Sequence, residues 1–212
     1  MTAFGSRELA NLVVALDAGL VIAAPTESSY GLLADARNPL ALDNLLSLKP
    51  RGPSKGQPLI VPDERVWRSL VARVPPNAER LAARFWPGPL TLVLPAQPKA
   101  ALDARVLLNG TLAVRIPGAS QAAQIVGAAG RALTATSANS PGTPPALTAE
   151  EVAEQFPEAL RDGRLLVTGS RAPGGAPSTL VQFEGSKWTV LRAGAIGMTE
   201  LSAALKRRAL PS

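Results

Sequence analysis

The chain contains no cysteine and no histidine. Without cysteine, disulfide bonds, thiol nucleophiles and thiolate metal sites are excluded. Without histidine, the usual general base, the Ser-His-Asp triad and almost every transition-metal site are excluded as well. An enzyme of this composition works with Lys, Arg, Ser, Thr, Asn, Tyr, carboxylates and backbone amides. These groups are suited to holding and positioning anions rather than to shuttling protons.

Long hydrophobic runs are also absent. The longest uninterrupted apolar segments, 12–16 and 20–24, have five residues each, too few for a helix that spans a bilayer. Glu8 and Asp17 interrupt the N-terminal apolar stretch, which argues against a signal peptide. We therefore expect a cytoplasmic protein without a membrane-bound segment.

Basic residues exceed acidic ones. Hydrophobic residues make up 46% and charged residues 18% of the 212 residues, which is typical of a globular protein. Lys and Arg number 22 against 16 Asp and Glu, which gives a net charge of +6, and 17 of the basic residues are Arg. This surplus indicates an anionic partner, either a phosphorylated small molecule or a nucleic acid. A genome that favours Arg codons explains the surplus equally well, since Ala, Gly and Pro are abundant too.

Apolar periodicity and turn residues predict alternating helices and strands in one domain. Ser6 and Thr199 are expected to cap the first and last helices, and Thr148 with Glu151 forms a capping box. The predicted helices cover residues 6–19, 40–48, 63–73, 77–85, 120–129, 149–155 and a short C-terminal segment. The predicted strands cover residues 20–24, 59–61, 90–94, 111–116, 132–136, 165–167, 179–183 and 189–191. The last two strands form an antiparallel hairpin, so we expect an α/β (α+β-like) fold with a mixed sheet.

Polar and cationic groups gather in loops next to the predicted strands. Residues 25–32 place hydroxyls at an expected strand-to-helix junction, where they either bind a polar ligand or simply cap the helix. Residues 49–58 carry Lys and Arg on a loop shaped by Pro and Gly, which is either a triphosphate clamp or a solvated basic loop. Ser137 and Asn139 project to one side of an extended chain, although polar strand ends are also common turn material. The phosphate motifs GxxxxGK[ST] and strand-linked GxGxxG are missing.

Seven short segments occur in a fixed order along the chain. They are Pro25-Thr26-Glu27-x-x-Tyr30-Gly31-Leu32, Lys49-x-Arg51-x-x-x-Lys55, Trp86-Pro87-Gly88-Pro89-Leu90-Thr91, Ala113-Val114-Arg115-Ile116-Pro117, Thr136-Ser137-Ala138-Asn139, Pro177-Ser178-Thr179 and Leu191-Arg192-x-Gly194-x-Ile196. In this order they resemble the YrdC-like family, threonylcarbamoyl-adenylate synthases that act in tRNA modification. The resemblance covers about residues 6–197, and residues 198–212 are expected to form a terminal helix and tail.

The resemblance implies a fold and a reaction. The fold is a single YrdC-like domain over residues 1–212, with a twisted mixed sheet, flanking helices and a concave basic cleft, in the short form without an extra C-terminal domain. The reaction combines L-threonine, bicarbonate and ATP into threonylcarbamoyl-AMP and pyrophosphate, for N6-threonylcarbamoyladenosine in tRNA. Mg is expected to arrive on the ATP phosphates, with no protein side chain as metal ligand. The proteins that transfer the threonylcarbamoyl group to tRNA are the expected partners.

The resemblance also implies the roles of individual residues. The catalytic residues are expected to be Lys49, Arg51, Ser137 and Asn139, and Lys55 and Arg192 join them in binding ATP. The threonine-binding residues are expected to be Ser28, Tyr30, Thr111, Arg115 and Ser178, with Arg115 pairing with the threonine carboxylate.

The sequence departs from the family pattern at several positions. Ser28 stands where the family usually has Thr, which leaves open whether other amino acids are accepted. Ser140-Pro141-Gly142 follows Asn139 in place of a more typical apolar-Ser-Gly, and Gly56-Gln57 extends the loop after Lys55.

Two other functions are compatible with these motifs. The same basic cleft is able to hold tRNA or double-stranded RNA without catalysis, in a binding module whose affinity falls steeply with salt. The second alternative is a carbamoyl-transfer domain of the hydrogenase-maturation type, although such domains usually lie within much longer chains. The clustering of cations beside hydroxyl and amide groups favours a small-molecule pocket.

Overall fold

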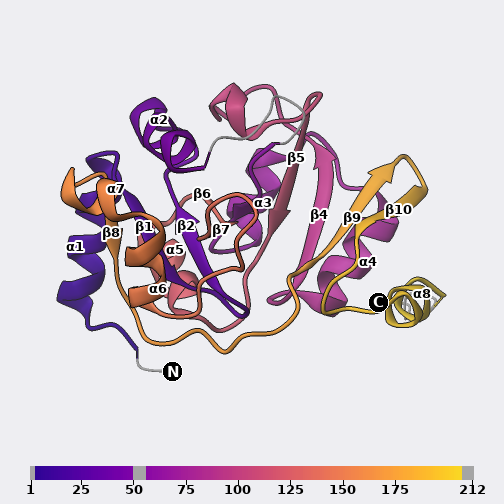
Figure 1. The fold of residues 1–212 in the computed structure, drawn as a ribbon. Helices are drawn as coiled ribbons and strands as arrows, with labels where there is room; N and C mark the ends of the chain where they lie inside the picture. Colours follow the sequence, from indigo (N-terminus) through magenta and orange to yellow (C-terminus); the bar gives the residue numbers. More distant parts are fainter. Residues whose placement is uncertain (1–2, 50–55, 207–212) are drawn as a thin grey trace.

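The computed structural model describes residues 3–49 and 56–206 (Figure 1). Helices and strands alternate along most of this length. Their order is α1 (Ser6–Asp17), β1 (Val21–Pro25), β2 (Tyr30–Leu33), α2 (Pro39–Leu48), β3 (Leu59–Ile60), α3 (Glu64–Leu70), α4 (Pro76–Phe85), β4 (Leu90–Pro95), a 3-10 turn η1 (Ala104–Val106), β5 (Thr111–Arg115), α5 (Gln121–Ala129), β6 (Leu133–Thr134), β7 (Thr136–Ser137), α6 (Ala149–Gln155), α7 (Pro157–Arg161), β8 (Leu165–Val167), β9 (Thr179–Glu184), β10 (Lys187–Arg192) and α8 (Met198–Lys206). The mixed α/β class predicted from the sequence is confirmed.

The described strands form two mixed sheets where one was predicted. The first sheet has the order β7-β2-β1-β8, with β1 antiparallel to β2 and parallel to β8. The second has the order β10-β9-β4-β5-β3-β6, with β4 parallel to β9 and antiparallel to β5. The two sheets meet where the chain beyond β2 pairs with β6: the Thr134 amide donates to the Ala34 carbonyl at 2.8 Å, and Asp35 bridges to Leu133.

Helices pack against both sheets, with α1 and α7 at the left of Figure 1 and α4 and α8 at the right. Helices α1 and α5 pack together against β1, and Leu16, Ile22 and Ile125 are buried between them. Helix α4 packs against β4 and against α8. Strand β1 is buried along its whole length because it lies between β2 and β8 and beneath these helices, which explains its uninterrupted apolar sequence.

Local signals explain several helix boundaries. Asn38 accepts hydrogen bonds from the amides of Leu40 and Ala41, with Pro39 in the first turn of α2. Ser120 caps α5 through the Ala123 amide. Gly130 ends α5 in the left-handed conformation, with φ of 63°.

Four local predictions were wrong. Residues 30–33 form a strand instead of the start of a helix, so the preceding hydroxyl-rich segment is the turn of a β-hairpin. The strand predicted over 132–136 is divided in two, because the Ala135 amide leaves the sheet to donate to the Pro58 carbonyl at 2.8 Å. Ser6 lies inside α1, which begins after Gly5 without a side-chain cap. Thr199 likewise lies within α8.

The capping box at α6 is half formed. The Thr148 hydroxyl accepts from the Glu151 amide at 3.2 Å as predicted. The Glu151 carboxylate, however, accepts from the amide of Leu147 at 2.6 Å, one residue earlier than a capping box requires. In α2, Leu40 is 54% exposed, because Ala41, Leu42 and Leu45 form the inward face of this helix.

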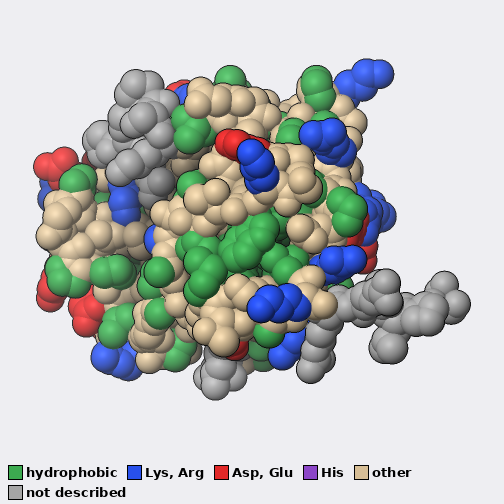
Figure 2. Space-filling view, turned by 90° about the vertical axis from the view of Figure 1, so that its right-hand side faces the viewer, with side chains coloured by type: hydrophobic (Ala, Val, Ile, Leu, Met, Phe, Trp, Pro, Cys, Tyr) green, Lys and Arg blue, Asp and Glu red, His purple; other side chains and the backbone are tan. Residues whose placement is uncertain are grey.

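The surface on the side of β10 and α8 mixes apolar and basic groups (Figure 2). Hydrophobic side chains gather at the centre of this face, and Lys and Arg side chains are scattered around them. In the part of the chain that the structure describes, no helix combines the length and hydrophobicity needed to cross a membrane.

Candidate active site

A cavity of about 1340 Å³ is lined by strands from both sheets. Its walls include the β1–β2 turn, β7 and the C-terminal end of α2 on one side, and β4, β5, β9 and β10 on the other. Among the described residues, its cationic lining side chains are Lys49, Arg73, Arg115 and Arg192, and Glu184 is the acidic one. The cavity therefore presents an excess of positive charge, which favours an anionic ligand.

The first polar group on the cavity wall is the Lys49 cluster, formed by Lys49, Ser137 and Asn139. The Lys49 ammonium donates to the Ser137 carbonyl at 2.7 Å, the Ser137 hydroxyl at 3.0 Å and the Asn139 side-chain oxygen at 2.6 Å. The Ser137 hydroxyl also donates to the Asn139 oxygen at 2.6 Å. The structure thus brings together three of the four predicted catalytic residues, from two segments 88 or more residues apart. Arg51 and Lys55 lie outside the described residues.

Backbone pairing positions the Lys49 cluster. Strand β7 pairs with β2, so that Ser137 lies opposite Gly31, and the Ala138 amide donates to the Tyr30 carbonyl at 2.8 Å. The Asn139 amide nitrogen donates to the carbonyls of Ser140 and Thr143, at 3.2 and 2.7 Å. Asn139 therefore presents its oxygen to Lys49 because its nitrogen is fixed by the following loop.

Two residues after Asn139 that depart from the family pattern, Ser140 and Pro141, have different surroundings. The Ser140 amide donates to the Gln155 side chain of α6 at 2.8 Å, which holds this loop against the helix. Pro141 lines the cavity next to the Lys49 cluster.

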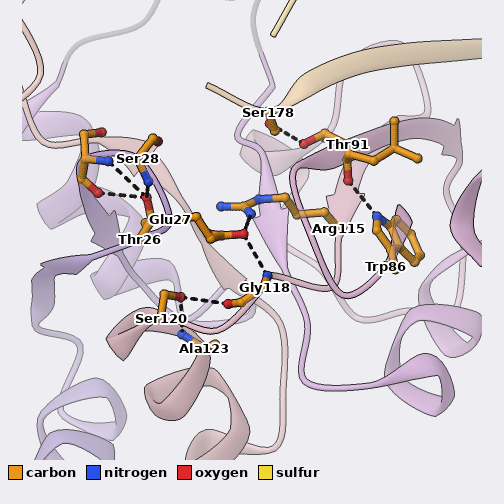
Figure 3. A network of polar contacts seen from close by, with 12 residues as sticks. Thr26, Glu27, Ser28, Trp86, Thr91, Arg115, Gly118, Ser120, Ala123 and Ser178 are labelled. Atoms are coloured by element: carbon orange, nitrogen blue, oxygen red, sulfur yellow. Dashed lines mark hydrogen bonds and ion pairs between the residues drawn. The ribbon is translucent and has the colours of Figure 1, made fainter. Parts of the chain in front are cut away.

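The second polar group is the Arg115 cluster, formed by Glu27, Arg115, Ser178 and Arg192 (Figure 3 shows the first three with their neighbours). Arg115 ends β5 and forms an ion pair with Glu27 of the β1–β2 turn. The Glu27 oxygen in this pair also accepts from the Gly118 amide at 2.7 Å. Both side chains are largely buried, with 11% of Arg115 and 21% of Glu27 exposed.

Ser178 directly precedes β9 and contacts residues of β4 and β10. Its hydroxyl lies 2.7 Å from the Thr91 hydroxyl of β4. Arg192, at the end of β10, donates from Nη2 to the Ser178 carbonyl at 2.9 Å and to its hydroxyl at 3.0 Å. Desolvation and, to a lesser degree, the positive charge of Arg115 lower the pKa of Arg192. Arg192, predicted to bind ATP, thus contacts a residue predicted to bind threonine.

Ser28 presents its hydroxyl to the cavity from the β1–β2 turn. The turn is stabilised by Thr26, whose hydroxyl donates to the Ser29 carbonyl at 2.8 Å and accepts from the amides of Ser28 and Ser29. Ser29 donates its own hydroxyl to the Tyr30 carbonyl at 3.4 Å. The Ser28 hydroxyl has no hydrogen-bond partner among the described residues, so it is available to a ligand.

The remaining two predicted threonine-binding residues are Tyr30 and Thr111. Their hydroxyls contact backbone carbonyls of the protein itself. Tyr30 is fully buried, and its hydroxyl lies 2.9 Å from the Ser170 carbonyl and 3.2 Å from that of Gly169. Burial, followed by the charge of Glu150, raises its pKa. The Thr111 hydroxyl donates to the Leu108 carbonyl at 2.7 Å. Thr111 starts the strand that Arg115 ends, so the backbones of the two residues lie about 13 Å apart along the strand axis.

Glu27 lies within the first sequence motif, which predicts no role for its side chain. In residues 3–49 and 56–206, no group of three or more His, Cys, Asp or Glu side chains is placed to hold a metal ion.

Known proteins resemble this chain in sequence and in fold. A family model for Sua5, YciO and YrdC, described as telomere recombination, matches residues 14–194. A threonylcarbamoyl-AMP synthase of Thiobacillus denitrificans is 40% identical over 179 residues, which cover 82% of this chain and 89% of that protein. One of Pyrococcus abyssi is 33% identical over 185 residues, and this chain spans only 53% of its length. The crystal structure of P. abyssi Sua5 complexed with L-threonine has a TM-score of 0.80 and 29% identity, covering 94% of this chain and 58% of that one.

Proposed function

Because the chain belongs to the Sua5, YciO and YrdC family, we propose that it is an L-threonylcarbamoyladenylate synthase. It joins L-threonine, bicarbonate and ATP into threonylcarbamoyl-AMP and releases pyrophosphate. The observation that carries this proposal is that the Lys49 cluster and the Arg115 cluster line one cavity. The Lys49 cluster has the donors of a phosphate site, and the Arg115 cluster has those of a carboxylate site. A nucleotide and an amino acid are therefore held side by side.

The physical problem in this reaction is electrostatic. The triphosphate, the bicarbonate and the threonine carboxylate are all anionic and repel one another when they are gathered in one cavity. Lys49, Arg115 and Arg192 on its walls offset this repulsion, and they do so more effectively than in water because the cavity is partly desolvated.

In this proposal the Lys49 cluster holds the nucleotide. The Lys49 ammonium is a compact charge that contacts phosphate oxygens, while Ser137 and Asn139 supply neutral hydrogen-bonding groups beside it. Arg51 and Lys55 are proposed to add phosphate contacts, as the sequence motif implies. Mg enters on the ATP phosphates, because the described residues offer oxygen and nitrogen groups suited to anions and no acidic cluster for the metal.

The Arg115 cluster holds threonine. Arg115 pairs with the substrate carboxylate, since its guanidinium matches a carboxylate in shape and charge. Ser28 and Ser178 supply hydroxyls from opposite walls, one from the β1–β2 turn and one from the start of β9. Tyr30 shapes the pocket from beneath, and Thr111 lines a more distant part of it.

Catalysis in this arrangement is mainly alignment. The threonine amine attacks the bicarbonate carbon, and loss of water leaves a carbamate. A carbamate oxygen then attacks the α-phosphorus of ATP, and pyrophosphate leaves. Arg192 contacts Ser178 and lies near Arg115, so it is placed to stabilise the charge that develops between the two substrates.

A synthase accounts for the cations better than an RNA-binding module does. The cavity cations lie beside hydroxyl and amide groups, whereas sequence-independent RNA binding needs basic groups along a backbone track. On the described face in Figure 2, Lys and Arg side chains are scattered around a hydrophobic patch and form no such track. We propose that the product passes to the proteins that transfer threonylcarbamoyl groups to tRNA, in keeping with the family's role in tRNA modification.

The proposal is tested by pyrophosphate release. Purified protein is incubated with ATP, Mg, bicarbonate and L-threonine, and pyrophosphate is measured over time. Release is expected only with the complete mixture, since the carbamate must form before the α-phosphorus is attacked. Release at the same rate without threonine or without bicarbonate would contradict the proposal.

A further inference from the structure

We propose that Glu27 is a positioning residue for the amino-acid substrate. It holds the Arg115 guanidinium by one nitrogen, so that the remaining nitrogens face the cavity and receive the substrate carboxylate. This inference rests on the proposed function, because it refines how the threonine site is built.

The ion pair leaves most of the guanidinium free. Only Nη1 of Arg115 contacts Glu27, and among the described residues no other side chain or carbonyl accepts a hydrogen bond from the Arg115 guanidinium. A guanidinium has five N–H donors in a planar fork. Because Arg115 lines the cavity, its unused donors are the ones available to a carboxylate that enters there.

Glu27 is itself fixed in place from another element. Its oxygen accepts from the Gly118 amide at 2.7 Å, in the turn that leads into α5 (Figure 3). Ser120 holds that turn, donating to the Gly118 carbonyl at 3.1 Å while capping α5 through Ala123. Glu27 therefore connects Arg115 to a helix terminus, which restricts the directions that the guanidinium is able to take.

The second oxygen of Glu27 is the feature that points to positioning rather than to stability. Oε2 is buried and has no hydrogen-bond partner within residues 3–49 and 56–206. An ion pair that served stability alone would be expected to engage both oxygens with both guanidinium ends, because an unsatisfied buried oxygen is costly. The one-sided contact leaves one edge of Arg115 open for a second carboxylate.

The chain contains a matched pair away from the cavity. Asp35 and Arg131 form a similarly buried ion pair, with Asp35 Oδ2 2.6 Å from Arg131 Nε, and neither residue lines the cavity. Asp35 also accepts from a backbone amide, that of Arg37, at 2.9 Å. In contrast to Glu27, both oxygens of Asp35 are used, and Arg131 has a second partner in Asp17.

The test compares Glu27→Gln with Asp35→Asn. Glutamine keeps a side-chain oxygen for the Gly118 amide and for Arg115 but removes the charge that fixes the guanidinium. Threonine affinity is measured calorimetrically without ATP, KM is measured for threonine and for ATP, and thermal unfolding is recorded. For Glu27→Gln we expect the threonine Kd and KM to rise about tenfold, with KM for ATP changed less than about twofold. For Asp35→Asn we expect a lower Tm with threonine affinity unchanged.

The outcomes separate this inference from the proposed function. If folded Glu27→Gln binds threonine as the native protein does, or if its KM for ATP rises as much as its KM for threonine, Glu27 is not a positioning residue. Glu27→Asp, with a shorter reach but the same charge, should restore part of the threonine affinity, which a purely structural role would not require. If the native protein neither binds threonine nor releases pyrophosphate, the proposed function and this inference both fail.

Discussion

The Lys49 cluster and the Arg115 cluster hold their cations in different ways, although they line the same cavity. Lys49 donates to three neutral acceptors, a carbonyl, a hydroxyl and an amide oxygen. Arg115 is paired with a carboxylate that is itself anchored to the backbone. These contacts of Lys49 are to uncharged groups, whereas Arg115 contacts a carboxylate that offsets the guanidinium charge before any ligand arrives.

This difference indicates different tasks. An anion that reaches Lys49 meets a compact positive charge, and it has to replace hydrogen bonds that the ammonium already makes. An anion that reaches Arg115 gains less net charge but meets a guanidinium whose direction is already set. We therefore expect the Lys49 cluster to act on the reacting phosphates and the Arg115 cluster to determine affinity for the amino acid.

The largest expected effect is that of Lys49→Ala. Removing the Lys49 cation should lower kcat/KM for threonine-dependent pyrophosphate release by about 100-fold or more, as for loss of a preorganised group that stabilises developing charge. Circular dichroism should be unchanged, since the neutral acceptors around Lys49 are left near the cavity. Lys187→Ala, at an exposed lysine of β10 outside the cavity, is the control. Equal activity in the two variants would remove Lys49 from the reaction.

The Lys49 cluster could be predicted only in part from residue patterns. The alternation of side chains along an extended chain placed Ser137 and Asn139 on one side, and the structure confirms that they are in contact. The approach of Lys49, however, depends on the pairing of β7 with β2 and on the end of α2, which are long-range features. Only the family resemblance linked these segments before the structure did.

The β1–β2 hairpin shows why strand β2 and the role of Glu27 could not be predicted from the sequence. A continuous apolar run identified β1, and the Thr148 cap identified the start of α6. Strand β2 contains Gly31 and follows a turn rich in hydroxyls, which resembles the start of a helix when only neighbouring residues are considered. Its strand conformation is fixed by β1 on one side and by β7 on the other. Glu27 received no role because its partner, Arg115, lies 88 residues away.

A smaller effect is expected from removing the Arg115 pair. Arg115→Met alone would leave Glu27 as an unpaired buried carboxylate, so it is combined with Glu27→Gln. The double variant should raise KM for threonine roughly 30-fold, since a hydrogen-bonded charge pair with the substrate is lost, and leave KM for ATP nearly unchanged. The control is Arg131→Met with Asp35→Asn, which removes the pair outside the cavity. A rise in KM for ATP alone would reverse the assignment of the two clusters.

The smallest effect is expected at Ser28, where the same turn supplies its own control. Ser28 and Ser29 are adjacent and both line the cavity, but the Ser29 hydroxyl donates to the Tyr30 carbonyl and that of Ser28 is unpartnered among the described residues. Ser28→Ala should raise KM for threonine about fivefold, the value of one neutral hydrogen bond, and Ser29→Ala should change it by less than about twofold. Steady-state kinetics at saturating ATP measure both values. Both variants remove one hydroxyl from the same turn, so a general effect on turn stability would raise KM for threonine equally in the two. An equal rise would exclude a direct contact between Ser28 and the amino acid.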